Sequence, residues 1–181
     1  MAIPDAQLTH VGIYARDVEQ LAAFYERHLG MVRTDDGVAA QGRKIAFLSR
    51  RADEHHQLVM IETLPGEQSG QAVRQLSFRV SDLAALKHFH REFATASTTG
   101  VEARNHGNSW SIYLRDPEGN VIEIYAPTPW YVSQPFRAPL DLAQPDEAIV
   151  EITRSLLAVN ETARPVQEWE AQMHRRLGAA T

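Results

Sequence analysis

The sequence predicts an α+β protein made of two tandem βαβββ modules followed by a helical tail. Three observations lead to this prediction. A strand-and-helix pattern near the N-terminus recurs 65 residues later, and a strand–turn–strand pattern closes the second copy. Five prolines then interrupt the chain between residues 127 and 145, which separates the modules from the C-terminal segment. A repeat of this length describes the whole fold, so it outranks local propensity.

The first module begins with a predicted strand at residues 8–15. Asp17 has the side chain of a helix N-cap, apolar residues then recur at helical spacing, and Gly30 ends the helix. Further strands are predicted at 38–40, 44–49 and 57–62, and the segment 64–70 has the composition of a linker.

The second module repeats the first from residue 75 onward. The matched pairs are Asp17 with Asp82, Leu21 with Leu86, and Phe24 with Phe89. Strands are predicted at 101–104, 109–114 and 121–125, the last two joined by a turn of type Asp-Pro-Glu-Gly. We therefore expect residues 1–127 to hold paired modules, at about 6–66 and 71–127.

Residues 128–181 form a different kind of segment, rich in proline and aromatic residues at its start. Two amphipathic helices are predicted there, one with an apolar stripe of Ile149, Ile152, Leu156 and Val159, the other with Val166, Trp169, Met173 and Leu177. We expect this tail to pack over a module or a partner subunit and to carry no chemistry.

The composition excludes several classes of function. A net charge of −5 without any basic run argues against nucleic-acid binding. The absence of cysteine excludes disulfides and thiolate metal sites, so a metal would need His, carboxylate or amide ligands. The N-terminus lacks the features of a signal peptide, and no apolar run reaches the roughly 18 residues of a membrane span. We expect a cytoplasmic protein without membrane contact.

The hairpin that closes the second module contains the strongest functional signal. Glu123 lies between Ile122 and Ile124 in an apolar strand, where a carboxylate is costly unless it is paired or binds a metal. The hairpin brings His106 and Tyr113 near it. Glu123 is therefore a candidate metal ligand.

The repeat and the hairpin together resemble the vicinal oxygen chelate superfamily and, within it, the type I extradiol ring-cleaving dioxygenases. The resemblance rests on His106, on Ile112-Tyr113, on the turn at 116–119 and on Glu123, in that order and spacing. It covers about residues 6–127. It implies that the sheets of the two modules curl into one open curved barrel with the site in its concavity, and that the protein forms homodimers.

The resemblance also implies a metal site made of His10, Gln75 and Glu123. The family's extradiol enzymes hold Fe(II) with two histidines and one carboxylate, and the repeat places the second histidine at residue 75, where this chain has Gln75. Fe(II) is the expected metal, with Mn(II), Zn(II) or Ni(II) as other candidates. An amide oxygen suits oxygen-preferring ions better than imidazole does. The alternative is that Gln75 is a polar strand residue and the metal is weakly bound or absent.

The expected reaction is ring cleavage of a catechol-like aromatic diol or a related vicinal-oxygen compound. The resemblance implies that His56, the second of a His-His pair, acts as acid and base, and that His106 and Tyr113 hold the catecholate.

Two other functions stay open. A glyoxalase-like isomerase or lyase would need a second glutamate, but the matching position is about Met60 and the nearest carboxylate is Glu62. A non-catalytic protein that binds a planar small molecule, like the bleomycin-resistance proteins, would tolerate Gln75.

Overall fold

The computed structural model describes residues 6–64, 67, 73–95 and 100–178 of the 181-residue chain. These residues belong to two compact units. The unit that we call the N-terminal unit comprises Asp5–Arg74 and the short segment Arg115–Asn120. The C-terminal unit comprises mainly Gln75–Leu114 and Val121–Thr181.

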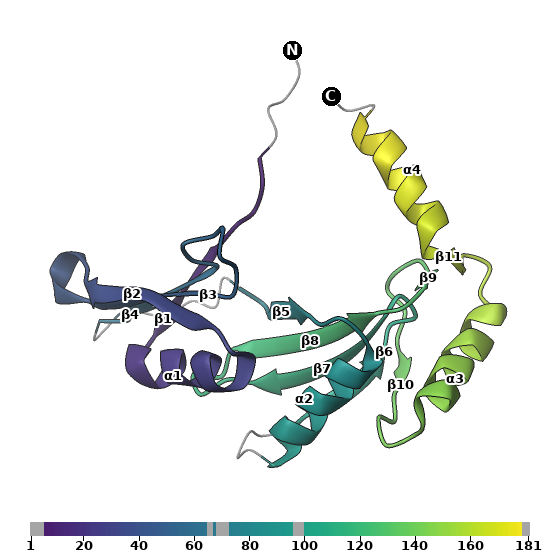
Figure 1. The fold of residues 1–181 in the computed structure, drawn as a ribbon, viewed down its shortest axis with the longest axis horizontal. Helices are drawn as coiled ribbons and strands as arrows, with labels where there is room; N and C mark the ends of the chain where they lie inside the picture. Colours follow the sequence, from purple (N-terminus) through teal and green to yellow (C-terminus); the bar gives the residue numbers. More distant parts are fainter. Residues whose placement is uncertain (1–5, 65–66, 68–72, 96–99, 179–181) are drawn as a thin grey trace. The chain divides into compact units, whose positions relative to one another are not determined.

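The N-terminal unit contains the first βαβββ module (Figure 1). Its elements are β1 (Val11–Ala15), α1 (Val18–Leu29), β2 (Val32–Val38), a 3-10 turn at Ala40–Gly42, β3 (Lys44–Ser49) and β4 (Leu58–Glu62). The sheet has the order β1-β4-β3-β2, with β1 parallel to β4 and the other pairs antiparallel. Helix α1 packs on β3 and β4, and this interface forms the apolar core of the unit.

Helix α1 begins and ends where the sequence predicts. The Asp17 carboxylate accepts a hydrogen bond from the backbone N–H of Gln20, and Gly30 follows the helix in a left-handed conformation with φ of 60°. The strand after the helix differs from the prediction of residues 38–40, since it runs over Val32–Val38. Its central Asp-Asp-Gly run has low strand propensity, but pairing with β3 supplies the hydrogen bonds that override this preference.

The C-terminal unit contains the second module. Its elements are β5 (Leu76–Arg79), α2 (Leu83–Thr95), β6 (Glu102–Asn105), β7 (Ser109–Arg115) and β8 (Val121–Pro127). Strand β5 is parallel to β8, as β1 is to β4. The Asp82 carboxylate accepts a hydrogen bond from the backbone N–H of Ala85 and caps α2 as Asp17 caps α1. The prediction of an α+β fold with two βαβββ modules is thus confirmed.

The tail belongs to the C-terminal unit and extends its sheet. Strand β10 (Ala138–Pro139) pairs with β6, which gives the order β10-β6-β7-β8-β5. Strands β9 (Trp130–Tyr131) and β11 (Arg164–Pro165) pair with each other. Both predicted tail helices are present, as α3 (Asp146–Ala158) and α4 (Val166–Gly178).

The predicted apolar stripe of α3 has the wrong phase. The buried residues are Ile149, Thr153 and Leu157, whereas Ile152 is 49% and Val159 87% exposed. The stripe was misplaced because Thr153 is polar, yet it is buried as the acceptor of two hydrogen bonds from the sheet. The stripe predicted for α4 contains no buried residue, although the Trp169 ring stacks on Tyr131.

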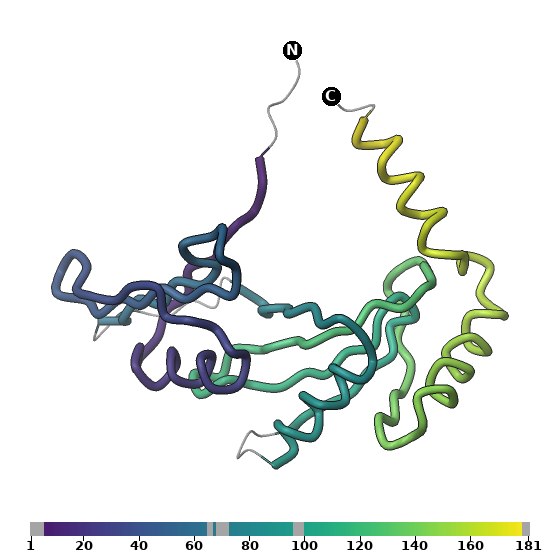
Figure 2. The backbone as a smooth tube through the Cα atoms, viewed as in Figure 1, coloured from purple at the N-terminus to yellow at the C-terminus, as the bar shows by residue number. Residues whose placement is uncertain are grey.

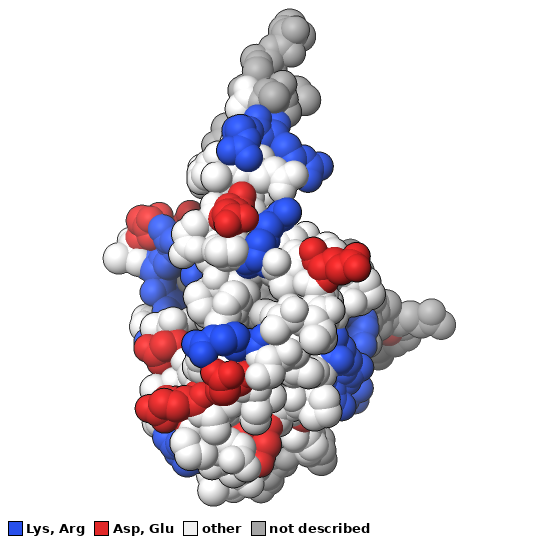
Figure 3. Space-filling model, turned by 90° about the vertical axis from the view of Figure 1, so that its right-hand side faces the viewer, with Lys and Arg blue, Asp and Glu red and all other residues white. Residues whose placement is uncertain are grey.

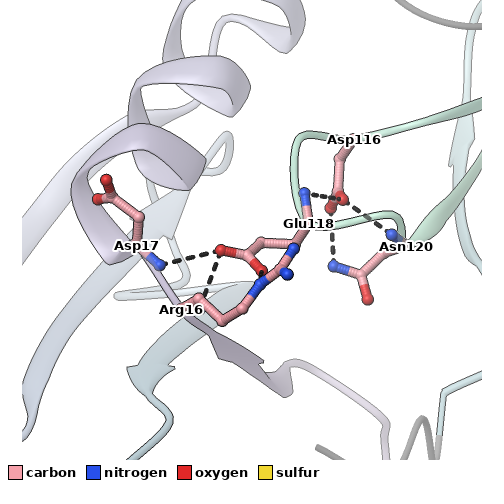
Figure 4. Close-up of polar contacts among 5 residues, drawn as sticks. All are labelled: Arg16, Asp17, Asp116, Glu118 and Asn120. Atoms are coloured by element: carbon pink, nitrogen blue, oxygen red, sulfur yellow. Dashed lines mark hydrogen bonds and ion pairs between the residues drawn. The ribbon is translucent and has the colours of Figure 1, made fainter.

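The turn between β7 and β8 is held by its own side chains and by the start of α1 (Figure 4). The Asp116 carboxylate accepts hydrogen bonds from the backbone N–H groups of Glu118 and Asn120. The Glu118 carboxylate accepts hydrogen bonds from the backbone N–H groups of Arg16 and Asp17, and it pairs with the Arg16 guanidinium at 2.6 Å. The two acids of the Asp-Pro-Glu-Gly turn are therefore structural residues.

Two features of the structure concern hydropathy and surface charge. In the part of the chain that the structure describes, no helix is long and apolar enough to cross a bilayer. On the face shown in Figure 3, acidic and basic side chains are interspersed. The cytoplasmic location stays a prediction.

Candidate functional site

Four of the predicted site residues come together in the C-terminal unit. Glu123 lies on β8, whose two neighbours in the sheet are β7 and β5. Tyr113 lies on β7, and Gln75 directly precedes β5. His106 follows β6, the other neighbour of β7. Side chains two residues apart on a strand share a face, and these strands are adjacent, so one face of the sheet gathers all four.

Glu123 is the centre of this group. Its Oε1 accepts a hydrogen bond from the Tyr113 hydroxyl at 2.5 Å, and its Oε2 accepts one from the Gln75 amide nitrogen at 2.9 Å. A third donor, the Ser77 hydroxyl, lies 2.6 Å from Oε2. The partners that a half-buried carboxylate requires are thus donors of the same unit. We call Gln75, Ser77, Tyr113, Glu123 and His106 the carboxylate network.

Ser77 is a member of this network that sequence reasoning missed. It is the register partner of Glu123 in the parallel β5–β8 pair. The repeat contained a usable signal, because Ser77 stands two residues after Gln75 and so lies on the same face of β5.

Tyr113 links the carboxylate to His106. The His106 Nε2 atom lies 3.0 Å from the Tyr113 hydroxyl, and the two rings meet edge to face. Burial, and then the hydrogen bond and charge of Glu123, raise the pKa of Tyr113 to about 12. The hydroxyl is therefore protonated at neutral pH and can act as a donor.

The other predicted residues, His10 and His56, lie in the N-terminal unit. Their rings are 4.5 Å apart between centroids. His55 Nδ1 is hydrogen-bonded to His56 Nδ1 at 2.9 Å, and His55 Nε2 to the Asp35 carboxylate at 3.1 Å. Burial of the His56 ring, and then the nearby His10 and His55, lower the pKa of His56. His56 is therefore neutral at physiological pH and able to accept a proton.

The position of the second glyoxalase-type glutamate contributes no ligand. Met60 is fully buried in the core of the N-terminal unit. Glu62, the nearest carboxylate in sequence, accepts a hydrogen bond from the backbone N–H of Lys44.

The donor atoms of the carboxylate network fit some metals better than others. Among the described residues, no group of three or more His, Cys, Asp or Glu side chains is arranged to hold a metal ion. The network offers a carboxylate and an amide, whose oxygens suit oxygen-preferring divalent cations. It does not offer the two imidazoles and one carboxylate of an Fe(II) site. The set of His10, Gln75 and Glu123 stays a prediction.

Comparisons with known proteins agree with this fold. Residues 7–124 match the family model described as the Glyoxalase/Bleomycin resistance protein/Dioxygenase superfamily. No curated protein matches the chain. Among solved structures, a glyoxylase/bleomycin resistance protein/dioxygenase domain from Frankia sp. is 17% identical with a TM-score of 0.59, covering 69% of this chain and 94% of its own.

Two further structures have more specific descriptions. The fosfomycin resistance protein FosX from Listeria monocytogenes, solved with Mn(II) and a dihydroxypropylphosphonic acid, is 13% identical with a TM-score of 0.56, covering 69% and 95% of the two chains. Lactoylglutathione lyase from Agrobacterium tumefaciens is 20% identical with a TM-score of 0.50, covering 68% and 96%. At these identities the likeness concerns the fold. The matched family model spans most of the chain and both βαβββ modules, and the protein belongs to the glyoxalase/bleomycin resistance/dioxygenase superfamily.

Proposed function

We propose that the protein binds a small molecule with two adjacent oxygen atoms, such as a catechol-like diol, at the carboxylate network. The observation that carries this proposal is the arrangement around Glu123. A half-buried carboxylate is surrounded by two hydroxyls and an amide, all on one sheet face. A group of prearranged donors and one strong acceptor is what a polar ligand needs for orientation.

The chain's own side chains suggest how such a ligand would be held. The Tyr113 hydroxyl, with its pKa of about 12, keeps its hydrogen, and it would bind an anionic ligand oxygen by turning toward the ligand the hydrogen that it now donates to Glu123. His106 supports Tyr113 from the other side at 3.0 Å. Glu123 can accept a hydrogen bond from a ligand hydroxyl, since a carboxylate has about four acceptor positions and three are used.

We further propose that the protein is a metal-dependent, extradiol dioxygenase-like enzyme. Glu123 would hold a divalent cation together with the Gln75 amide oxygen, once the Gln75 amide turns so that its oxygen, and not the nitrogen that now donates to Glu123, faces the ion. His10 is the third ligand predicted from the resemblance. When bound, the cation would act as a Lewis acid and a template for the diol and O2. The oxygen-rich donor set favours Mn(II) over the Fe(II) that the resemblance implies. His56, kept neutral by its surroundings, is the proposed proton acceptor.

Metal titration of the chelator-treated protein tests the metal site. Calorimetry with Mn(II), and with Fe(II) under anaerobic conditions, should give one site whose affinity falls at least tenfold in Glu123→Gln. Glu147→Gln, on the exposed start of α3, is the matched control and should bind like the parent protein. Equal metal affinity of the two variants would overturn the ligand role of Glu123.

Oxygen consumption with a panel of catechols tests the reaction. The metal-loaded protein should consume O2 with at least one diol, and Tyr113→Phe should lower the rate. Absence of turnover across the panel would overturn the dioxygenase activity.

A second candidate function is binding without catalysis. It is favoured by the three hydrogen bonds to Glu123, which satisfy most of the carboxylate without any metal. Calorimetry with the same diols in the presence of a chelator separates the two functions. Binding that persists there, without O2 consumption in the metal-loaded protein, supports the binder, whereas binding that requires the metal contradicts it.

A further inference from the structure

We propose that the tail segment 132–137, which we call the strap, positions His106 in the carboxylate network, and that Gln134 is the residue through which it acts. The proposal rests on the proposed function, because it assigns the strap to the same site. The strap lies outside the matched family region, which ends at residue 124. Figure 2 traces the chain from the end of β8 through this segment toward α3.

Gln134 ties the strap to the backbone of His106. Its amide nitrogen donates a hydrogen bond to the His106 carbonyl at 2.9 Å, and its amide oxygen accepts one from the backbone N–H of Phe136 at 3.0 Å. One side chain thus connects residue 106 to residue 136. This connection places the Phe136 carbonyl beside the His106 ring, 2.9 Å from Nδ1.

The Phe136 carbonyl decides which ring nitrogen of His106 carries a hydrogen. A carbonyl oxygen only accepts hydrogen bonds, so Nδ1 must be the donor in this pair. The other nitrogen, Nε2, is then an acceptor that faces the Tyr113 hydroxyl and competes with Glu123 Oε1 for the single hydrogen of that hydroxyl. A partner at one ring nitrogen fixes the tautomer and the ring orientation in this way at many histidine sites.

Close packing between the strap and residue 107 also supports the positioning of His106 by the strap. Gly107 has a φ of 73°, and a Cβ added there would lie 2.5 Å from Cγ1 of Val132. The Thr128 hydroxyl, just before the strap, donates a hydrogen bond to the Gly107 carbonyl at 2.6 Å. The backbone next to His106 therefore contacts the tail without intervening space, which limits how far the ring can shift.

Helix α3, further along the tail, packs on the sheet next to His106. The Thr153 hydroxyl, fully buried, accepts hydrogen bonds from the Asn105 amide and the Trp110 indole N–H, both at 2.9 Å. Asn105 directly precedes His106, and its own side-chain oxygen accepts the Gly107 N–H at 2.8 Å. The tail thus contacts both chain neighbours of His106.

Nitrogen NMR of the histidine side chains in the full-length protein tests this proposal. His106→Gln identifies the His106 signals by their loss. The parent protein should show the tautomer with hydrogen on Nδ1. Gln134→Ala should shift the His106 nitrogens toward a mixture of tautomers, and Gln134→Glu, which keeps the acceptor for Phe136 but loses the donor to His106, should give an intermediate shift.

Gln144→Ala is the matched control, since Gln144 is an exposed tail glutamine whose amide donates to Asp141. Its His106 signals should equal those of the parent protein. Unchanged His106 signals in folded Gln134→Ala would overturn the positioning role, and so would equal shifts in Gln134→Ala and Gln144→Ala. Gln134→Glu offers the same test if Gln134→Ala does not fold.

Ligand binding gives a second readout that separates this proposal from the proposed function. Gln134→Ala should weaken diol binding about tenfold relative to Gln144→Ala, as loss of a supporting residue does at comparable sites. Absence of diol binding in the parent protein would contradict the proposed function alone, because the tautomer measurement needs no ligand. Full diol affinity in Gln134→Ala would overturn the strap's contribution to the site.

Discussion

Substitution of Gly107 by alanine measures how closely the tail packs on the sheet. With a φ of 73°, residue 107 has a backbone conformation that costs an alanine roughly 1–2 kcal/mol relative to glycine. The new Cβ would also lie 2.5 Å from Val132, 3.1 Å from Leu157 and 3.3 Å from Phe136. Van der Waals contacts between carbon atoms are about 3.5–4.0 Å, so the neighbours must move.

The neighbours have little room to do so. Val132 is fully buried and Leu157 is 4% exposed. Overpacking of this kind costs about 1–3 kcal/mol, which gives a total loss of about 2–5 kcal/mol in the free energy of unfolding for Gly107→Ala.

Gly100→Ala supplies the matched control in the same unit. Gly100 has nearly the same backbone conformation, with a φ of 70°, but a Cβ there would meet no atom within 4 Å. The control should lose only the backbone cost, so the two variants should differ by about 1–3 kcal/mol.

Urea denaturation followed by tryptophan fluorescence is a suitable assay. The three tryptophans, Trp110, Trp130 and Trp169, all belong to the C-terminal unit, so the signal reports the unit that contains both glycines. Equal losses of stability in Gly107→Ala and Gly100→Ala would refute the close packing between the tail and residue 107.

Three further predictions concern the same unit. Thr153→Val keeps the side-chain shape but leaves two buried donors without an acceptor, so the free energy of unfolding should fall by about 2–4 kcal/mol. A loss below about 1 kcal/mol in urea denaturation would contradict this expectation. The raised pKa of Tyr113 favours its neutral form, so its contribution to stability should be complete below pH 10 and disappear as pH rises to about 12. Tyr113→Phe should remove this part of the pH dependence, and an unchanged profile would refute the assignment. Leu157→Ala should lower the free energy of unfolding by about 2–5 kcal/mol and Ile152→Ala by less than about 1 kcal/mol, because only the Leu157 side chain is buried. A larger loss in Ile152→Ala would instead support the helix face predicted from the sequence.

The carboxylate network changes how Gln75 is understood. The repeat places this residue where the resemblance implies a second histidine ligand, so the sequence alone suggests that Gln75 is a weaker metal ligand. In the structure its amide nitrogen donates to Glu123 and also lies 3.0 Å from the Ser77 hydroxyl. Gln75→His is therefore informative, because it removes a donor from Glu123 while adding the imidazole that the resemblance implies.

Much of the fold was predictable from short stretches of sequence. Asp17 and Asp82 cap helices through bonds to residues three positions away, so the signal and its physical cause are local. The turn between β7 and β8 is similar, since Asp116 bonds the backbone of the next few residues. The need of Glu123 for polar partners could also be predicted, because burial of a carboxylate between two isoleucines is costly in any fold.

The identity of those partners depended on the tertiary structure. Ser77 and Glu123 are 46 residues apart and meet only through the parallel register of β5 and β8. The tail illustrates the same limit, since the polar Thr153 can be buried on α3 because Asn105 and Trp110, from distant strands, donate hydrogen bonds to it. The sequence by itself determined the modules, their helix ends and the carboxylate that requires partners. Only the tertiary structure decided which donors satisfy that carboxylate and how the tail contacts His106, because hydrogen bonds between distant segments depend on strand register and helix phase.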